Sequence, residues 1–152
     1  MITFAQTTVQ AKELTNRLGV GYSNEMSVDL PSIAAQYYPS PELGLSAALG
    51  VETGDDLSNF GLLIKVYRII FPEDHMNFYM GAGAGLLSTK VDDDNESGFE
   101  LSGFVGGEFF IPGIDSLGFS FEGGIGIVSL SSGVEFRTIG HHPLQAGMIF
   151  YF

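Results

Sequence analysis

The sequence predicts an all-β fold, a closed eight-stranded antiparallel up-and-down transmembrane β-barrel, and three observations lead to this class. After residue 16, apolar and polar side chains alternate with a period of two almost everywhere, which is the pattern of strands. Glycine makes up 21 of the 152 residues, well above its usual share of roughly 7%. Short turns that contain proline alternate with longer polar loops, as expected when each strand pairs with the next.

Length and composition exclude several other classes. A chain of 152 residues has the length of one domain, and the lack of cysteine rules out disulfides and thiolate metal sites. The net charge of −12 argues against nucleic-acid binding through a basic face. No run of about 18 apolar residues is present, so a transmembrane helix is not expected.

The chain is expected to divide into an N-terminal lead-in, residues 1–15, and a barrel, residues 16–152. The stretch "TTVQAKELTNRL" contains good helix formers, so the lead-in is expected to be either a short helix or disordered. As a helix, it could cover one mouth of the barrel.

The first four strands are expected at 16–25, 31–39, 43–53 and 59–70. The first and third carry glycines on one face, at Gly19, Gly21, Gly44 and Gly50. The second ends at the proline-bearing turn "YPSPEL". The fourth, "NFGLLIKVYRII", places Phe60, Leu62, Ile64 and Val66 on one face and Gly61, Leu63, Lys65 and Tyr67 on the other.

The last four strands are expected at 76–88, 98–111, 117–130 and 142–152. The fifth has a glycine row at Gly81, Gly83 and Gly85. In the sixth and seventh, the face opposite the apolar one carries Gly106, Glu108, Glu122, Gly124 and Gly126. The eighth alternates to the end, with Leu144, Ala146, Met148, Phe150 and Phe152 on one side and Gln145, Gly147, Ile149 and Tyr151 on the other.

The distribution of residues over the two faces indicates which face is inside. A soluble barrel would be apolar inside, whereas a membrane barrel is apolar outside and polar or small inside. Glycine on a solvated outer surface weakens a strand without any gain, so we place the glycine rows inside. Bulky Tyr67, Tyr79, Phe104 and Phe110 would then fill the space that the glycines leave. This membrane arrangement is favoured over a soluble, lipocalin-like one.

Four charged residues fall on the inward face and form a predicted polar network of the lumen, namely Arg17, Lys65, Glu108 and Glu122. The first lies nearer one end of the barrel and the others near mid-height. Charges are costly in lipid but can pair inside a barrel. An eight-stranded barrel is only just wide enough for side chains to fill, so a plugged lumen is favoured over a narrow pore for small polar or cationic solutes.

With its alternating end, the chain resembles the small eight-stranded outer-membrane barrels of Gram-negative bacteria, the OmpA/OmpX-like superfamily. Met148, Phe150 and Phe152 resemble the C-terminal signal that the barrel-assembly machinery reads in these proteins. The resemblance implies a bacterial outer-membrane location with both termini and the proline-bearing turns periplasmic. It also implies that the longer loops are extracellular.

In that orientation most of the eighteen acidic residues would form an acidic extracellular rim, which consists of Glu25, Asp29, Glu52, Asp55, Asp56, Asp92, Asp93, Asp94, Glu96, Glu100 and Glu135. Such a rim would repel lipid phosphates unless divalent cations bridge them. Asp92, Asp93, Asp94 and Glu96 are weak candidates for a Ca²⁺ site, because hard cations take several oxygens. They lack EF-hand spacing, and a solvated loop is favoured.

No cofactor and no catalytic site are expected. Lipid A deacylases of similar size carry a His and a Ser two residues apart, and neither His141 and His142 nor His75 shows that pattern. A lipid A-modifying enzyme would have to bring Ser129 or Ser131 to a His and Glu135. The function predicted from the sequence is therefore a structural or partner-binding outer-membrane protein. Its partners would be membrane lipid, the assembly machinery and an unidentified envelope protein.

Overall fold

A computed structural model describes residues 12–54, 57–91, 94–138 and 144–152. The regular structure of these residues consists of nine β-strands: β1 Leu18–Ser23, β2 Ser32–Ser40, β3 Leu43–Thr53, β4 Leu57–Glu73, β5 Met76–Val91, β6 Asp94–Phe110, β7 Leu117–Leu130, β8 Gly133–Thr138 and β9 Gln145–Tyr151. Within the described ranges, no helix has the length and apolar character needed to cross a membrane.

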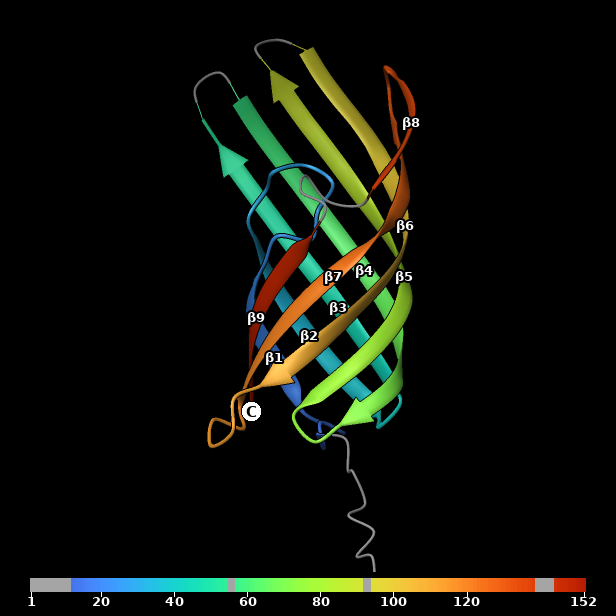
Figure 1. The fold of residues 1–152 in the computed structure, drawn as a ribbon. Coiled ribbons are helices and arrows are strands. Elements are labelled where there is room, and N and C mark those ends of the chain that lie inside the picture. Colours follow the sequence, from blue (N-terminus) through green and yellow to red (C-terminus); the bar gives the residue numbers. More distant parts are fainter. Residues whose placement is uncertain (1–11, 55–56, 92–93, 139–143) are drawn as a thin grey trace, which may run out of the picture.

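The strands form a closed antiparallel barrel with eight positions around the wall (Figure 1). Each strand from β1 to β7 pairs with the next, and β9 pairs with both β7 and β1, which closes the sheet. β8 and β9 share the eighth position, because β7 pairs with β9 along 117–122 and with β8 along 125–130. The predicted eight-stranded up-and-down barrel is therefore confirmed.

Residues 131–138, the described part of a segment that was predicted to be a long polar loop, depart from that prediction. After a turn at Ser131 and Ser132, β7 and β8 form a hairpin in which Leu130 pairs with Gly133. Val134 and Phe136 on β8 pair with Ser129 and Ile127 and continue the outward face of β7. The serines, glycines and histidines of this segment led to the prediction of a loop, although residues 133–138 alternate like the other strands.

The two ends of the barrel differ in construction. Figure 1 shows the C-terminus at the same end as the turns that join β2 to β3, β4 to β5 and β6 to β7. This is called the lower end. At the opposite, upper end β3, β4, β5, β6 and the β7–β8 hairpin rise above β1, β2 and β9 (Figure 1); β4, β5 and β6 have 17, 16 and 17 residues, against 6 in β1.

Side chains alternate between a buried inner face and an exposed apolar outer face. A Cβ atom added to Gly81 would lie 2.6 Å from Tyr67 Cβ and 2.8 Å from Phe104 Cζ, so this inward glycine makes room for the rings. On the outer face, Ile33 and Val105 keep 71% and 57% of their surface exposed. The barrel is thus apolar outside, as the sequence predicted, and this is the arrangement of a membrane barrel rather than a soluble one.

The connection between β1 and β2, residues 24–31, folds into the upper part of the barrel (Figure 1). Met26 and Leu30 are 0% and 2% exposed. Both pack against inward glycines, with Leu30 Cγ only 2.6 Å from where a Cβ on Gly50 would lie. The prediction that Glu25 belongs to an exposed acidic rim is therefore wrong, because this side chain is 4% exposed inside the barrel. Residues 24–31 are called the inserted loop below.

Residues 12–17 cross the lower mouth without helical structure in the described part of the lead-in. Leu14 is buried in the core, and the Asn16 amide donates to the Tyr38 carbonyl at 2.8 Å. Lys12 lies over the Phe110 ring and donates a hydrogen bond to Asp115. That hydrogen bond and the positive charge lower the pKa of the Asp115 carboxyl. Residues 1–11 of the predicted lead-in lie outside the described residues.

Candidate functional site

The most chemically distinctive part of the molecule is a set of buried polar side chains inside the barrel. Lys65 on β4 reaches across the lumen to Glu122 on β7, with Nζ 2.8 Å and 2.7 Å from the two carboxylate oxygens. The same Nζ lies 2.5 Å from Glu25 Oε2 of the inserted loop, in an ion pair that is not aligned as a hydrogen bond. All three side chains are at most 4% exposed. One cation is thus shared by two carboxylates.

Two aromatic side chains complete this central cluster, which we define as Glu25, Lys65, Tyr79, Phe104 and Glu122. The Tyr79 hydroxyl donates to Glu122 Oε1 at 2.7 Å. The Lys65 ammonium lies 4.8 Å from the centroid of the Phe104 ring, within the range of a cation–π contact. These contacts tie β4, β5, β6, β7 and the inserted loop together at one level.

A second group, the lower cluster, surrounds Glu108 on β6. Tyr38 donates to one oxygen of this carboxylate at 2.8 Å, and Tyr151 lies 2.5 Å from the other. The Tyr151 hydroxyl is also 2.6 Å from Gln36 Oε1. Both neighbours are acceptor oxygens and a hydroxyl has one hydrogen, so the Tyr151 hydroxyl is shared as a donor between Glu108 and Gln36. Within the described residues, no cation forms a salt bridge with Glu108.

The inserted loop is held by three further contacts. The backbone amide of Ser27 donates to Glu100 Oε2 at 3.2 Å, and its carbonyl accepts from Arg137 Nη2 at 2.7 Å. The Gln145 side chain donates to the Glu25 carbonyl at 2.7 Å. Glu100 was predicted on the exposed acidic rim, which is wrong, because it is 3% exposed and faces the loop.

The four predicted lumen residues do not form one network. Lys65 and Glu122 are in direct contact in the central cluster, whereas Glu108 belongs to the lower cluster. Arg17 lies at the lower end, where its Nη2 donates to the Tyr151 carbonyl at 3.0 Å and is 3.4 Å from Ser116 Oγ. It therefore reaches the lower cluster only through the backbone of Tyr151.

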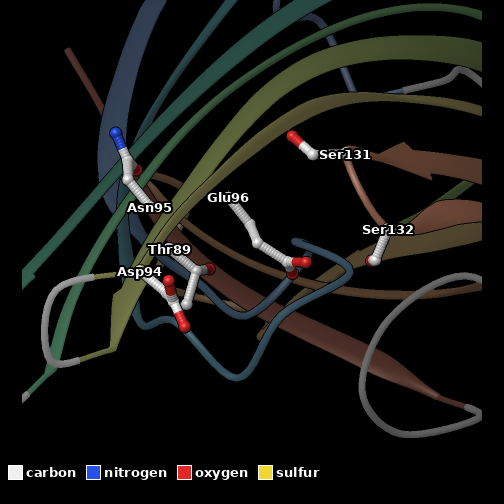
Figure 2. Close-up of a pocket in the computed structure, with 6 residues that line it drawn as sticks. All are labelled: Thr89, Asp94, Asn95, Glu96, Ser131 and Ser132. Carbon is white, nitrogen blue, oxygen red and sulfur yellow. The ribbon is translucent and has the colours of Figure 1, made fainter.

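The remaining predicted site residues lie at the upper end or on the outside. Asp94 and Glu96 line an open cleft of about 410 Å³, together with Thr89, Asn95, Ser131 and Ser132 (Figure 2). The Glu96 carboxylate points into the space in front of the Ser131–Ser132 turn (Figure 2). No group of three or more potential metal ligands occurs in the described ranges. Asp92 and Asp93, and likewise His141 and His142, lie outside them.

The residues of the predicted assembly signal all face outward. Met148, Phe150 and Phe152 are 46%, 54% and 65% exposed, while Ile149 and Tyr151 between them are buried. Ser131 of the enzyme alternative donates to the Ser97 carbonyl, and Glu135 is exposed on β8. His75 lies in the exposed turn between β4 and β5.

Several members of the two clusters were not predicted from the sequence. Tyr151 was expected on the inward side of the last strand but not in the polar network, and Tyr38 and Gln36 share the inward parity of their strand, which could have identified them. Glu25 had no such signal, because the pattern of a loop does not reveal whether it folds inward. The apolar side chains of Met26, Val28 and Leu30, spaced two apart beside Glu25, are the one hint that the loop is not solvated.

Comparison with known proteins agrees with the architecture. Neither a protein-family model nor a curated protein matches the sequence. The crystal structure of the N-terminal β-barrel domain of Pseudomonas aeruginosa OprF is similar, with a TM-score of 0.65 and 13% sequence identity over 91% of this chain and 98% of that one. Similarity at this identity concerns the fold, so the predicted likeness to the eight-stranded outer-membrane barrels is confirmed at that level.

Proposed function

We propose that this chain is a small integral protein of the bacterial outer membrane whose barrel is plugged by its own side chains, and that it acts structurally or by binding partners through acidic extracellular loops. The observation that carries the proposal is the contrast between its faces. Large apolar side chains stand exposed around the wall, while Lys65, Glu108 and Glu122 are buried within it. A bilayer removes the first from water, and a closed lumen pairs the second.

The filled lumen is supported by contacts at three levels. The inserted loop occupies the upper part, the central cluster crosses the middle, and the lower cluster with Leu14 fills the lower part. Aromatic rings lie against one another between these levels, with Tyr67 and Tyr79 centroids 4.7 Å apart. We infer that water and solutes do not pass through the resting barrel.

The orientation follows from the difference between the ends. We infer that the lower end, with its short turns and the C-terminus, faces the periplasm. The N-terminal residues 12–17 also lie at this end, so both termini would be periplasmic. The upper ends of the long strands and their hairpins would then lie on the extracellular side, as in other small membrane barrels.

The upper hairpins supply the expected contacts with partners. Exposed acids there include Asp29, Glu52, Asp94 and Glu135. We propose that they bind an envelope partner of opposite charge or bind divalent cations that bridge them to lipid phosphates. Phe150 and Phe152 on the outward face of β9 and beyond it would meet the assembly machinery during insertion. No enzymatic role is proposed.

Three measurements test the proposal. A folded membrane barrel requires detergent or lipid and migrates differently on a gel before and after boiling, so a monodisperse protein without detergent would contradict it. Reconstituted into planar bilayers, the plugged barrel is expected to show no steady conductance. Variants should bind a cationic partner less well when Asp94 and Glu135 are changed to Asn and Gln.

A narrow pore for cations is the second candidate, and one observation favours it. The described lumen buries three carboxylates, Glu25, Glu108 and Glu122, and one ammonium group, that of Lys65, which contacts only the first and the third. An excess of carboxylates would attract cations if the inserted loop moved out. Steady cation-selective openings of the unmodified protein would replace the plugged barrel with this alternative.

A further inference from the structure

Four of the six tyrosines of the chain lie inside the barrel, namely Tyr38, Tyr67, Tyr79 and Tyr151. Each is at most 3% exposed. The ring centroids of Tyr79 and Tyr67 are 4.7 Å apart, and those of Tyr67 and Tyr38 are 5.9 Å apart. The Tyr38 and Tyr151 centroids follow at 6.1 Å. These are separations of aromatic rings in contact, so the four rings form a continuous row from the central cluster to the lower cluster.

Three of the four hydroxyls lie against a buried carboxylate. Tyr79 donates to Glu122, while Tyr38 and Tyr151 both contact Glu108. Packing alone does not explain this arrangement, because phenylalanine would fill the same space without any need to bury a carboxylate, and burying a charge is costly. A carboxylate that accepts the hydrogen bond of a phenol is placed to take the proton of that phenol. Loss of this proton, together with one electron, converts tyrosine into a neutral radical.

Both carboxylates can take a proton without leaving a buried cation unpaired. In the central cluster two carboxylates share one ammonium group, so Lys65 keeps Glu25 when Glu122 is protonated. In the lower cluster Glu108 has no salt bridge to any residue that the structure describes. Tyr67 lies between the clusters and differs from its neighbours, because its buried hydroxyl has no hydrogen-bond partner among the described residues. Its ring connects the neighbouring tyrosines, but no base is in place to take its proton.

The wall beside Tyr79 is thin because it lacks side chains. Tyr79 pairs with Gly106 of β6, and its Cε2 atom lies 3.0 Å from where a Cβ on Gly106 would lie, so the ring covers the inner side of this glycine. On the outer side, an apolar recess of about 410 Å³ is lined by Gly106, Gly123, Val105 and Phe121, among others. The backbone of Gly106 thus separates the Tyr79 ring from a molecule in that recess, which on the proposed function faces lipid.

We propose that the lumen tyrosines form a one-electron relay, which carries an oxidising equivalent from a lipid peroxyl radical in the recess through Tyr79 and Tyr67 to Tyr38 and Tyr151. The apolar lining admits an oxidant that dissolves in the bilayer, and peroxyl radicals are the one-electron oxidants that unsaturated acyl chains form with oxygen. The inference rests on the proposed membrane location and adds a redox activity to the plugged barrel.

In the first step the O–H bond of Tyr79 breaks, its electron passes to the peroxyl radical, and its proton forms a new O–H bond on Glu122. The reduced peroxide takes a proton from interfacial water, which gives a lipid hydroperoxide and hydroxide. In the second step Tyr79 regains an electron from Tyr38, across the ring between them, and a proton from Glu122. Tyr38 in turn gives its own proton to Glu108. The radical then lies in the lower cluster, away from the lipid.

Electron paramagnetic resonance of the full chain in vesicles of unsaturated phosphatidylcholine tests the relay. The background variant Tyr22→Phe, Tyr37→Phe removes the two outward tyrosines, so a tyrosyl radical in it comes from the lumen. A lipid-soluble azo initiator supplies peroxyl radicals in air, and samples are frozen during the reaction. We expect a tyrosyl signal that narrows when the tyrosines are ring-deuterated. Adding Tyr79→Phe should remove most of this signal, although Tyr38 and Tyr151 remain.

A matched pair of substitutions in the background variant tests the proton step. Glu122→Gln keeps every lumen tyrosine but removes the proton acceptor of Tyr79, so it should also remove most of the signal. Glu100→Gln changes another buried carboxylate, which accepts from the Ser27 amide and from no tyrosine, and should leave the signal unchanged. The shift in gel mobility on boiling shows that each variant is folded.

The outcomes separate the two proposals. A barrel that inserts into bilayers but gives no tyrosyl signal in the background variant would overturn the relay and leave the membrane function intact. An equal signal with and without Tyr79→Phe, or equal signals for Glu122→Gln and Glu100→Gln, would do the same. A protein that remains monodisperse without detergent would overturn both proposals.

Discussion

The central and lower clusters stabilise buried carboxylates in different ways. Glu122 in the central cluster accepts from Lys65 and Tyr79, so an opposite charge compensates it. Glu108 in the lower cluster is equally buried at 1% exposure, yet its partners are the hydroxyls of Tyr38 and Tyr151. The first cluster therefore depends on charge balance and the second on hydrogen-bond geometry.

This difference has consequences for what each cluster holds in place. The central cluster joins the inserted loop to the wall, because Lys65 is paired with Glu25 of the loop and Glu122 of β7. The lower cluster joins β2, β6 and β9, which are parts of the wall itself. Loss of the Lys65 cation should thus loosen the inserted loop. Loss of a hydroxyl in the lower cluster should instead weaken the packing of strands near the β1–β9 pair that closes the barrel.

The largest expected effect is that of Lys65→Met. It leaves Glu25 and Glu122 buried without their cation, and removing one partner of a buried ion pair costs about 3–5 kcal/mol. Urea unfolding in detergent, followed by gel mobility, should show this loss. The triple variant with Glu25→Gln and Glu122→Gln should recover much of it, since no unpaired charge remains. An unchanged midpoint for Lys65→Met would contradict the ion-pair account.

Much of the wall could be predicted from the sequence, because in a strand with one apolar face the alternation shows which side chains point to the lipid and which point to the lumen. The inward positions of Lys65, Glu108, Glu122 and Tyr67 followed from parity alone. The partners could not be predicted in the same way, since the pairing of Lys65 with Glu122 depends on the stagger of strands around the closed barrel. Glu25 was predicted on the extracellular rim instead of inside the lumen, because the alternation that orients strand residues does not apply to a loop.

β8 illustrates the other limit of sequence reasoning. The residues Gly133–Thr138 alternate like a strand, but they are flanked by serines on one side and by Gly140, His141 and His142 on the other. In the sequence, the turn-forming and polar residues on both sides gave a stronger signal for a loop than an alternation over only six residues gave for a strand. The change of partner along β7, from β9 to β8, has no counterpart in the local pattern and arises from the register of the barrel.

Tyr151→Phe should have an intermediate effect. It removes a hydroxyl shared by Glu108 and Gln36, and leaving buried polar groups unsatisfied costs about 1–3 kcal/mol. The matched control is Tyr22→Phe, which removes a hydroxyl from a half-exposed outward side chain and should be close to neutral in detergent. Equal unfolding midpoints for the two variants would mean that the lower cluster does not stabilise the fold.

Glu108→Gln should have a smaller effect, within about 1 kcal/mol of the wild type. Glutamine keeps a carbonyl acceptor for one tyrosine and offers an amide donor to the other hydroxyl, and no cation loses its partner. Glu122→Gln is the matched change in the central cluster and should be clearly more destabilising, because Lys65 then keeps only Glu25. A larger loss for Glu108→Gln than for Glu122→Gln would reverse the assignment of charge balance to the central cluster.

The smallest effect concerns a carboxylate outside the barrel wall. Lys12 lowers the pKa of Asp115, so the folded state binds the proton less readily than the unfolded chain. This contribution to stability is present above the pKa of Asp115 in the unfolded chain and is lost as pH falls through its lower folded value. Asp115→Asn should therefore weaken the contact of the lead-in with the β6–β7 turn, which Lys12 and Asp115 form, at neutral pH but not in strong acid. Amide hydrogen exchange of Asn16, whose amide bonds to the Tyr38 carbonyl, would measure it. Equal exchange rates of wild type and variant at neutral pH would show that this exposed pair, unlike the buried ones, contributes nothing.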